Sequence, residues 1–165
     1  MKILVMSDSH SGKSFMKHCV ERLQPDVMIH LGDHFEDGTD LAELFPRIPL
    51  HQVPGNCDRY RMVAWHPEVL CYTVCGVRLY MTHGHNHKVK SGLYALLADA
   101  RAAGAQAVLY GHTHCADCHR EPDGLWVLNP GSCGSYSGSV GMIEAEAGSI
   151  LNCRIYRQTD LEEMV

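Results

Sequence analysis

The sequence lacks any long run of apolar residues. No stretch approaches the roughly 18 residues that a membrane-spanning helix needs, so we expect no membrane association. The apolar run near the N-terminus covers only about five residues, shorter than the core of a secretory signal, and it stops at Ser7 and Asp8. We therefore expect a cytoplasmic protein in which most of the eight cysteines are reduced, small core residues.

An excess of positive charge is missing as well. The formal net charge is −5, from 14 basic and 19 acidic residues, which argues against stable nucleic-acid binding. Repeats, low-complexity tracts and linkers are absent too. With 165 residues, 45% of them hydrophobic, the chain is expected to form a single domain over residues 1–165 that buries a sizeable core. A homo-oligomer stays an open alternative.

The order of short apolar runs and amphipathic segments predicts a mixed α/β fold. The first half alternates strands with helices, and the second half is rich in strands. The predicted strands are 2–6, 26–33, the start of 49–58, the hairpins 68–85 and 115–132, 106–111, and a final pair over 139–157. The predicted helices are 11–25, 39–46, which Thr39 or Asp40 would cap, and 88–105. Two sheets packed face to face with helices outside would accommodate these elements.

Twelve histidines are present, and several of them follow predicted strands together with Asp and Asn. The segments at these strand ends are 7–10 (SDSH), 32–34 (GDH), 54–58 (PGNCD), 83–85 (HGH) and 111–114 (GHTH). Open α/β sheets bind ligands beyond the carboxyl ends of their strands. We therefore expect the Asp, Asn and His side chains of five strands to meet in one place.

The spacing of these residues suggests a pair of metal ions. Residues i and i+2 of an extended segment point to the same side, about 6–7 Å apart, so Asp8 and His10 could bind one ion. His112 and His114 could straddle two ions about 3.5–4 Å apart, and Asp33 could bridge them. A shell of mostly neutral ligands would leave the ions a net positive charge that attracts a phosphate ester. Mixed nitrogen and oxygen ligands suit manganese, iron, cobalt, nickel or zinc better than calcium.

This ordered set of motifs resembles that of the calcineurin-like metallophosphoesterases. The pattern D-x-H, G-D, G-N-x-[DE], H and G-H-x-H reads here as DSH, GD, GNCD, HGH and GHTH, followed by NPGS. The resemblance covers roughly residues 1 to 135 and is strongest for the small, single-domain YfcE-like phosphodiesterase branch. It implies a four-layer α-β-β-α sandwich of two mixed sheets, and a metal-dependent phosphodiesterase in which a hydroxide that bridges two metals attacks phosphorus.

The resemblance also implies which residues hold the metals. One ion would be bound by Asp8, His10, Asp33 and His114, and the other by Asp33, Asn56, His83 and His112. Asp33 and Asn56 would therefore also be catalytic. The two ions would be divalent transition metals, manganese first, with nickel, iron, cobalt or zinc as alternatives, and the substrate would be a small phosphodiester.

One position departs from the family pattern. Many relatives carry a histidine after the Asn, where this chain has Cys57, and a thiol with an ordinary pKa of about 8.5 is a poor acid for an alkoxide leaving group. Cys57 is expected to contact substrate, and its presence favours substrates with better leaving groups. His85 is the candidate replacement as acid or phosphate contact; a solvated loop histidine is the other interpretation. Asp58 is expected to orient a ligand from behind, and His34 to line the pocket.

Two alternative functions stay open. The chain could be a non-catalytic interaction scaffold, as in the retromer subunit that resembles this family, or a phosphomonoesterase. Cys115 and Cys118, with His119, resemble half of a zinc site, but no second cysteine pair follows at the spacing of a zinc finger. We therefore interpret these two cysteines as structural.

Overall fold

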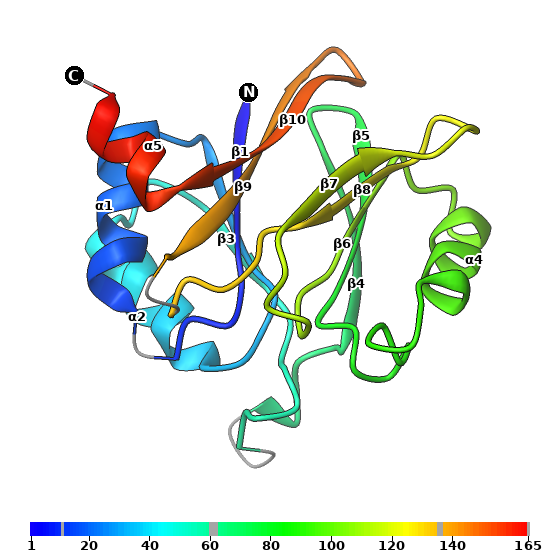
Figure 1. Cartoon of the computed structure of the whole chain (residues 1–165), viewed down its shortest axis with the longest axis horizontal. Coiled ribbons are helices and arrows are strands. Elements are labelled where there is room, and N and C mark those ends of the chain that lie inside the picture. The colour runs from blue at the N-terminus through cyan, green and yellow to red at the C-terminus, as the bar shows by residue number, and fades with distance from the viewer. Residues whose placement is uncertain (11, 60–62, 135–136, 165) are drawn as a thin grey trace.

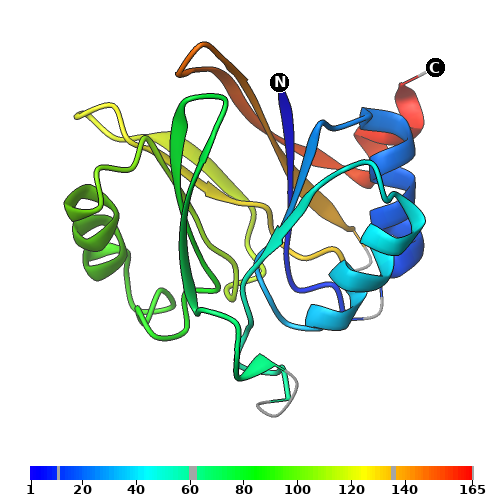
Figure 2. The ribbon, with the colours of Figure 1, turned by 180° about the vertical axis from the view of Figure 1, so that it is seen from behind.

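The computed structural model describes residues 1–10, 12–59, 63–134 and 137–164. Two five-stranded sheets face each other, and helices cover their outer faces (Figures 1 and 2). The first sheet has the order β10 (Ser149–Arg157), β9 (Ser139–Glu146), β1 (Lys2–Met6), β2 (Val27–His30), β3 (Leu50–Gln52). The second has the order β4 (Val69–Val74), β5 (Val77–Thr82), β6 (Ala107–Leu109), β8 (Trp126–Asn129), β7 (Asp117–Arg120).

Helices α1 (Lys13–Leu23), α2 (Phe35–Leu44) and α5 (Gln158–Glu163) lie outside the first sheet, and α4 (Tyr94–Ala102) lies outside the second. Both sheets are mixed: β1, β2 and β3 are parallel, as are β5, β6 and β8, whereas β9, β10, β4 and β7 pair antiparallel. The predicted α-β-β-α sandwich is confirmed.

The alternation of side chains along the central strands creates three apolar layers. In β1, Ile3 and Val5 point into the core between the sheets, whereas Leu4 and Met6 point into the core under the helices. All four side chains are fully buried. A strand buried on both faces reads as a continuous apolar run, which is why KILVM has no polar residue after Lys2. This arrangement leaves the strand ends as the place where polar side chains gather.

The second helix differs from its prediction at the N-terminus. The expected helix 39–46 is α2, which begins four residues earlier at Phe35, so neither Thr39 nor Asp40 is its cap. The backbone N–H of Phe35 donates a 2.8 Å hydrogen bond to Asp58 Oδ1, a residue 23 positions away. Because this carboxylate satisfies a first-turn N–H from outside the helix, no local capping residue is needed. Patterns within the segment could not reveal that long-range contact.

Two further helices differ from expectation. The predicted helix 88–105 is shorter, because residues 84–92 form successive turns that bury Val89 against Gly84, and α4 begins only at Tyr94. Helix α5 was not expected at all. The carboxylate of Asp160 accepts a hydrogen bond from the backbone N–H of Arg157, and Leu161 is fully buried.

None of the helices in the described residues is long and apolar enough to span a membrane.

Candidate metal centre

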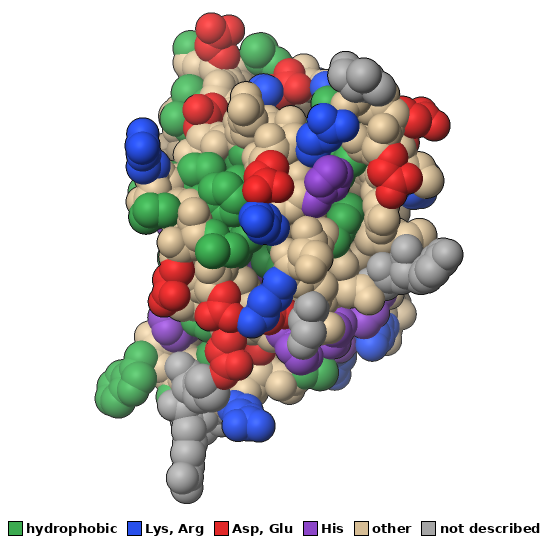
Figure 3. All heavy atoms as spheres, turned by 90° about the vertical axis from the view of Figure 1, so that its left-hand side faces the viewer, with side chains coloured by type: hydrophobic (Ala, Val, Ile, Leu, Met, Phe, Trp, Pro, Cys, Tyr) green, Lys and Arg blue, Asp and Glu red, His purple; other side chains and the backbone are tan. Residues whose placement is uncertain are grey.

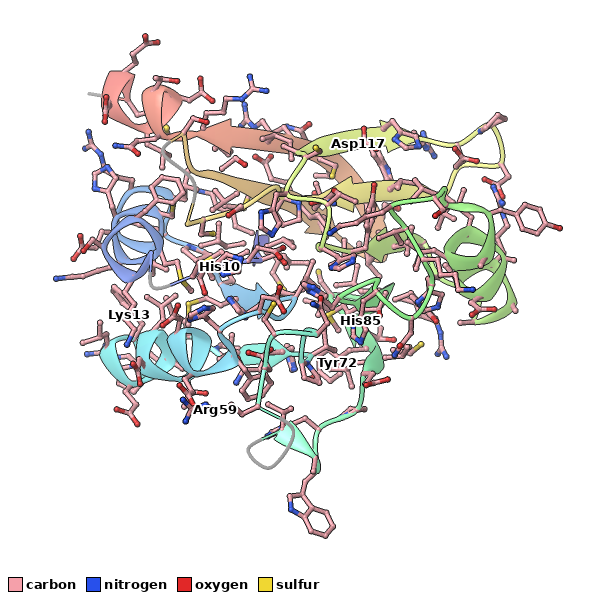
Figure 4. All side chains as sticks on the ribbon, turned by 60° about the horizontal axis from the view of Figure 1, so that its bottom comes forward. His10, Lys13, Arg59, Tyr72, His85 and Asp117 are labelled. Carbon is pink, nitrogen blue, oxygen red and sulfur yellow. The ribbon has the colours of Figure 1, made fainter. Side chains whose placement is uncertain are left out.

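The loops that follow β1, β2, β3, β5 and β6 leave both sheets at the same end, which is the lower end in Figure 1. In the space-filling view, histidine side chains gather towards this end (Figure 3). Figure 4 looks onto it, with His10 among the loops of the first sheet and His85 among those of the second. The sequence-predicted ligands therefore share one end of the sandwich.

Four of these ligands form a compact group. Single ligand atoms of Asp8, His10, Asp33 and His114 all lie within 4.8 Å of one another. The Nε2 atom of His114 is 3.0 Å from Asp8 Oδ1 and 3.5 Å from His10 Nε2. The two carboxylates are buried and the two imidazoles are exposed, so the acidic groups form the floor and the imidazoles form the rim.

The remaining predicted ligands adjoin this group through Asp33. His83 Nε2 is 3.5 Å from Asp33 Oδ2 and 3.1 Å from Asn56 Oδ1. The rings of His83 and His112 are 5.1 Å apart between centroids. Asp33 thus lies between two sets of donors, one of them formed by Asp8, His10 and His114 and the other by Asn56, His83 and His112.

The backbone at the site is unusual. Five of the seven residues have positive φ angles, between 41° and 68°; they are Asp8, His10, Asp33, His112 and His114. Residues other than glycine rarely adopt this left-handed backbone conformation. Those that do are concentrated at functional sites, where the surrounding structure holds the strained backbone in place. The expectation that Asp8 to His10 and His112 to His114 are extended segments is therefore wrong. The ligand atoms of Asp8, His10 and His114 converge through tight left-handed turns instead.

The Asp8 carboxylate has one satisfied and one unsatisfied oxygen. Oδ2 accepts hydrogen bonds from the Ser7 hydroxyl at 2.6 Å and from the His112 backbone N–H at 3.1 Å. Oδ1 is buried and accepts no hydrogen bond of good geometry from the described residues; the imidazole Nε2 atoms of His114 and His83 lie 3.0 Å and 3.9 Å from it. A buried carboxylate oxygen without a donor is costly, and a cation that coordinates it would remove that cost. The residues present therefore fit a metal ion at this position.

The ring of His83 is held in one orientation. Its Nδ1 lies 2.8 Å from the carbonyl oxygen of Leu31, which can only accept, so Nδ1 carries the proton and Nε2 keeps its lone pair. Nε2 is the atom that faces Asp33 and Asn56. A backbone carbonyl behind a ligand histidine is the usual means of fixing the tautomer that binds metal.

The charges at the site suit metal binding at neutral pH. Burial raises the pKa of Asp33, but the proximity of His83 and the 2.8 Å hydrogen bond from the Cys57 backbone N–H outweigh it, and the net pKa is below its ordinary value. Burial and the neighbouring His83 lower the pKa of His112. Asp33 is therefore ionised and His112 is a neutral imidazole, which are the forms that coordinate metals.

Asp58 connects two of the loops. Its Oδ2 accepts hydrogen bonds from the backbone N–H groups of Gly55 at 2.7 Å and Asp33 at 3.0 Å, and its Oδ1 accepts the bond from Phe35. The loop after β2 is thereby fixed to the loop after β3, which places Asp33 beside Asn56. This is the geometry by which Asp58 would orient a ligand without touching the metal.

The glycines of the motifs allow close approach. A Cβ on Gly55 would lie 2.2 Å from Asp33 Oδ1, and a Cβ on Gly111 would lie 2.1 Å from Ser7 Oγ and 2.8 Å from Asp8 Oδ2. No side chain fits in that space. The Gly of GNCD and the Gly of GHTH are thus explained by the room that the two carboxylates need.

The residues proposed to contact substrate lie at the margin of the site. His85 is half-buried, its ring is 5.5 Å from that of His83, and its Nδ1 has no hydrogen-bond partner in the described part of the chain. Cys57 is mostly exposed, and the desolvation of the part of its thiol that is covered, together with the nearby Asp33, raises the pKa of that thiol. The ring of His34 lies 5.0 Å from that of His10 and is also at the margin.

Sequence reasoning missed several supporting groups. His30 is fully buried under the site, where its Nε2 is 3.2 Å from Ser9 Oγ, and that hydroxyl also bonds Asp37 at 2.8 Å. Ser132, from the NPGS segment, donates a 2.8 Å hydrogen bond to the carbonyl oxygen of Asp8. These contacts hold the loop after β1 on three sides. A histidine inside an apolar strand was the only available signal for His30, and a single polar residue there does not reveal its partner.

Known proteins share both the sequence pattern and the fold. The family model for the calcineurin-like phosphoesterase superfamily domain matches residues 1–147. The chain belongs to this superfamily. A probable metallophosphoesterase of Bacillus subtilis, YsnB, is 31% identical over 135 residues, which are 80% of this chain and 75% of that protein. The predicted family is confirmed.

Several solved structures superpose on almost the whole chain. A predicted phosphoesterase from Streptococcus pneumoniae has a TM-score of 0.74 at 23% identity, covering 95% of this chain and 97% of that one. The phosphoesterase YfcE from E. coli has a TM-score of 0.63 at 22% identity, covering 93% and 98%. Vps29 of Entamoeba histolytica, solved with Zn²⁺, has a TM-score of 0.71 at 19% identity, covering 95% and 99%. At these identities the three structures establish the shared fold.

Proposed function

We propose that this chain is a metal-dependent phosphodiesterase with a site for two divalent metal ions. Asp8, His10, Asp33 and His114 would hold one ion, and Asp33, Asn56, His83 and His112 the other. The observation that carries the proposal is the convergence of the first four ligand atoms within 4.8 Å of one another, beside a buried Asp8 oxygen that accepts no hydrogen bond from the described residues. Manganese is the metal we favour, with nickel, iron, cobalt or zinc as alternatives, because the donors are mixed nitrogen and oxygen.

Bound ions would supply Lewis acidity, lower the pKa of a bound water and neutralise charge on the phosphoryl oxygens. The residues of the chain determine the net charge of the site and the orientation of the ligands. Asp8 and Asp33 are the only carboxylates among the seven proposed ligands, so the loaded site would keep a positive charge for an anionic ester. His83, with its proton fixed on Nδ1 by Leu31, would present a lone pair without reorganisation.

The side chains that could protonate the oxygen of the leaving group are weak acids. They favour hydrolysis of a diester over that of a monoester with a poor leaving group. The thiol of Cys57 stays protonated at neutral pH, because partial burial and Asp33 raise its pKa, and it is a weak proton donor. Burial and His83 lower the pKa of His85, so this imidazole is neutral and can donate one N–H to a phosphate oxygen. Catalysis would then depend on a leaving group that departs without strong protonation.

A small substrate is favoured by the surroundings of the site. A pocket of about 410 Å³ adjoins Asn56 and His85 and is also lined by Asp58, His66 and Glu68. Acidic lining disfavours substrates with additional phosphate groups near this pocket. On the face drawn in Figure 3, acidic and basic side chains are interspersed, and the net charge is −5, so a small phosphodiester rather than a nucleic-acid polymer is the proposed substrate.

The assay is hydrolysis of an aryl phosphodiester by protein that has been stripped of metal and then reloaded with Mn²⁺. Activity should require the metal, and Asp33→Ala or His112→Ala should abolish it, while His119→Ala, on β7, serves as a matched histidine control. A parallel assay with an aryl phosphomonoester separates the two esterase activities. Full activity in metal-free buffer, or in the Asp33 variant, would contradict the proposal.

A non-catalytic scaffold is the second candidate, and its support is the structural likeness to Vps29. The complete set of seven ligand side chains favours the enzyme, because a scaffold has no need to keep them. Elemental analysis of the purified chain discriminates: absence of bound transition metal, with no activation by any, would favour the scaffold. We also propose a cytoplasmic location, since all eight cysteines are free.

A further inference from the structure

The C-x-x-C segment of this chain is divided by the fold. Cys115 lies before β7 and is exposed, whereas Cys118 lies within β7 and is half-buried. The sulfur of Cys118 is 3.0 Å from the sulfur of Cys153, which belongs to β10. The spatial partner of Cys118 is therefore 35 residues away and in the other sheet, not the neighbouring cysteine of its own motif.

The two strands are suited to a cross-link. Strand β7 is the edge of the second sheet, β10 is the edge of the first, and the two pack against each other. Cys153 is 8% exposed and belongs to the core between the sheets, and Cys118 packs against that core from the rim. The thiol of Cys118 is partly accessible from solvent, and the thiol of Cys153 lies buried next to it. An attacking and a resolving cysteine are arranged in this way.

The thiols also differ in acidity. The hydrogen bond between them lowers the pKa of Cys118 and, together with burial, raises the pKa of Cys153. Cys118 is also the less buried of the two thiols, so it is the one that an oxidant reaches first, and the buried Cys153 is the partner that reacts second. Asymmetry of this kind favours an ordered reaction over random oxidation.

We propose that Cys118 and Cys153 are a redox modification site, which closes to a reversible disulfide between the two sheets when the protein meets a hydroperoxide. The Cys118 thiolate attacks the terminal oxygen, the O–O bond breaks, and the peroxide leaves as an alcohol, or as water from hydrogen peroxide. The Cys153 thiol then attacks the resulting sulfenic sulfur, the S–S bond forms, and water leaves. Two thiols are oxidised and one hydroperoxide is reduced; a dithiol reverses the bond by exchange.

The bond would act on the stability of the sandwich. It would close a loop of about 35 residues that includes β8, β9 and the segment from which Ser132 bonds Asp8. Restriction of the unfolded chain by a loop of this length predicts a rise in Tm of about 8–15 °C. Because β7 begins soon after His114, the bond would also anchor the strand that follows the proposed ligand loop.

The test treats the full chain with equimolar hydrogen peroxide and then blocks the remaining thiols. We expect the loss of one pair of titratable thiols, a mass decrease of two hydrogen atoms, and a linked peptide that contains Cys118 and Cys153. The Tm should rise and should return to its starting value in dithiothreitol. Cys118→Ser and Cys153→Ser should each eliminate the linked peptide and the rise in Tm, and Cys115→Ser, an exposed cysteine of the same motif, should retain both.

Several results would overturn this assignment. They are a linked peptide that joins Cys115 to Cys118, thiol loss that persists unchanged in Cys118→Ser, or oxidation without a linked peptide. Should the buried Cys153→Ser variant fail to fold, peptide mapping of the unmodified sequence and of Cys118→Ser still decides the question. None of these readouts uses phosphoesterase activity, so the result is independent of the proposed function.

Discussion

The ring of His83 is fully buried and donates a hydrogen bond of 2.8 Å from Nδ1 to the carbonyl oxygen of Leu31. Leu31 directly follows β2 of the first sheet, and His83 directly follows β5 of the second. The bond therefore joins the two sheets at the base of the candidate site. It also determines that the lone pair of Nε2 is directed at Asn56 and Asp33.

Replacement of His83 should remove a ligand and this inter-sheet contact together. We expect His83→Ala to lower kcat/KM for a phosphodiester at least about 100-fold and to lose one of the two bound metals. Metal content by elemental analysis and activity over a Mn²⁺ titration would measure both effects. The variant His119→Ala is the control. A His83→Ala protein that keeps two metals and normal activity would show that His83 is not a ligand.

Gly111 tests the close packing around Asp8. In Gly111→Ala, the new Cβ would meet Ser7 Oγ at 2.1 Å and Asp8 Oδ2 at 2.8 Å, so the carboxylate has to move. We expect at least about a tenfold loss of activity, because a misplacement of about 1 Å at a catalytic group is costly. Gly104→Ala, which meets nothing within 4 Å, is the matched control and should lose only about 1 kcal/mol of stability from its backbone angle. Equal activity of the two variants would refute the packing argument.

The sequence was sufficient to predict the sandwich and the end of it where the ligands gather. An apolar run such as KILVM indicates a strand that is buried on both faces. A motif that directly follows such a run therefore lies at the end of a strand. The sites of Asp8, Asp33 and His114 were predictable for this reason. Their conformation was not, because a left-handed backbone at a residue other than glycine depends on the tertiary contacts that hold it.

Contacts between distant segments were the part that sequence patterns could not supply. The start of α2 depends on Asp58, and the position of the loop after β1 depends on His30 and Ser132. The pairing of Cys118 with Cys153 is a contact of the same kind. Each of these involves residues at least 20 positions apart, for which periodicity carries no information.

Asp58 is expected to support the site through the backbone alone. In Asp58→Asn the amide can accept at only one of its two positions, so at least one of the N–H groups of Gly55, Asp33 and Phe35 loses its acceptor. We expect a loss of about 1–3 kcal/mol in the free energy of unfolding, with a fall in kcat larger than any rise in KM. Urea unfolding and steady-state kinetics would measure these. Glu68→Gln, a carboxylate of the adjoining pocket that accepts no backbone bond in the described contacts, is the control.

The buried His30 is expected to make the folded protein less stable as the pH falls. Burial lowers the pKa of His30 to about 4, whereas in the unfolded chain it would have its ordinary value near 6.5. Above pH 6.5 the imidazole is neutral in both states and its titration has no effect. Between pH 6.5 and 4 the unfolded state binds the proton and the folded state does not, so the protein is progressively destabilised as the pH falls, by up to about 3 kcal/mol.

The variant His30→Gln keeps a polar side chain towards Ser9 and cannot be protonated. It should be less stable than the unmodified protein at pH 7.5, because the packing around a fully buried ring is lost, yet it should lose less of its remaining stability between pH 6.5 and 4. The measurement is urea unfolding over this pH range in metal-free buffer, with His119→Gln, a histidine outside the core, as the control. If the free energy of unfolding fell equally steeply with pH in the His30 variant and in the unmodified chain, the destabilisation at low pH would have to come from other groups.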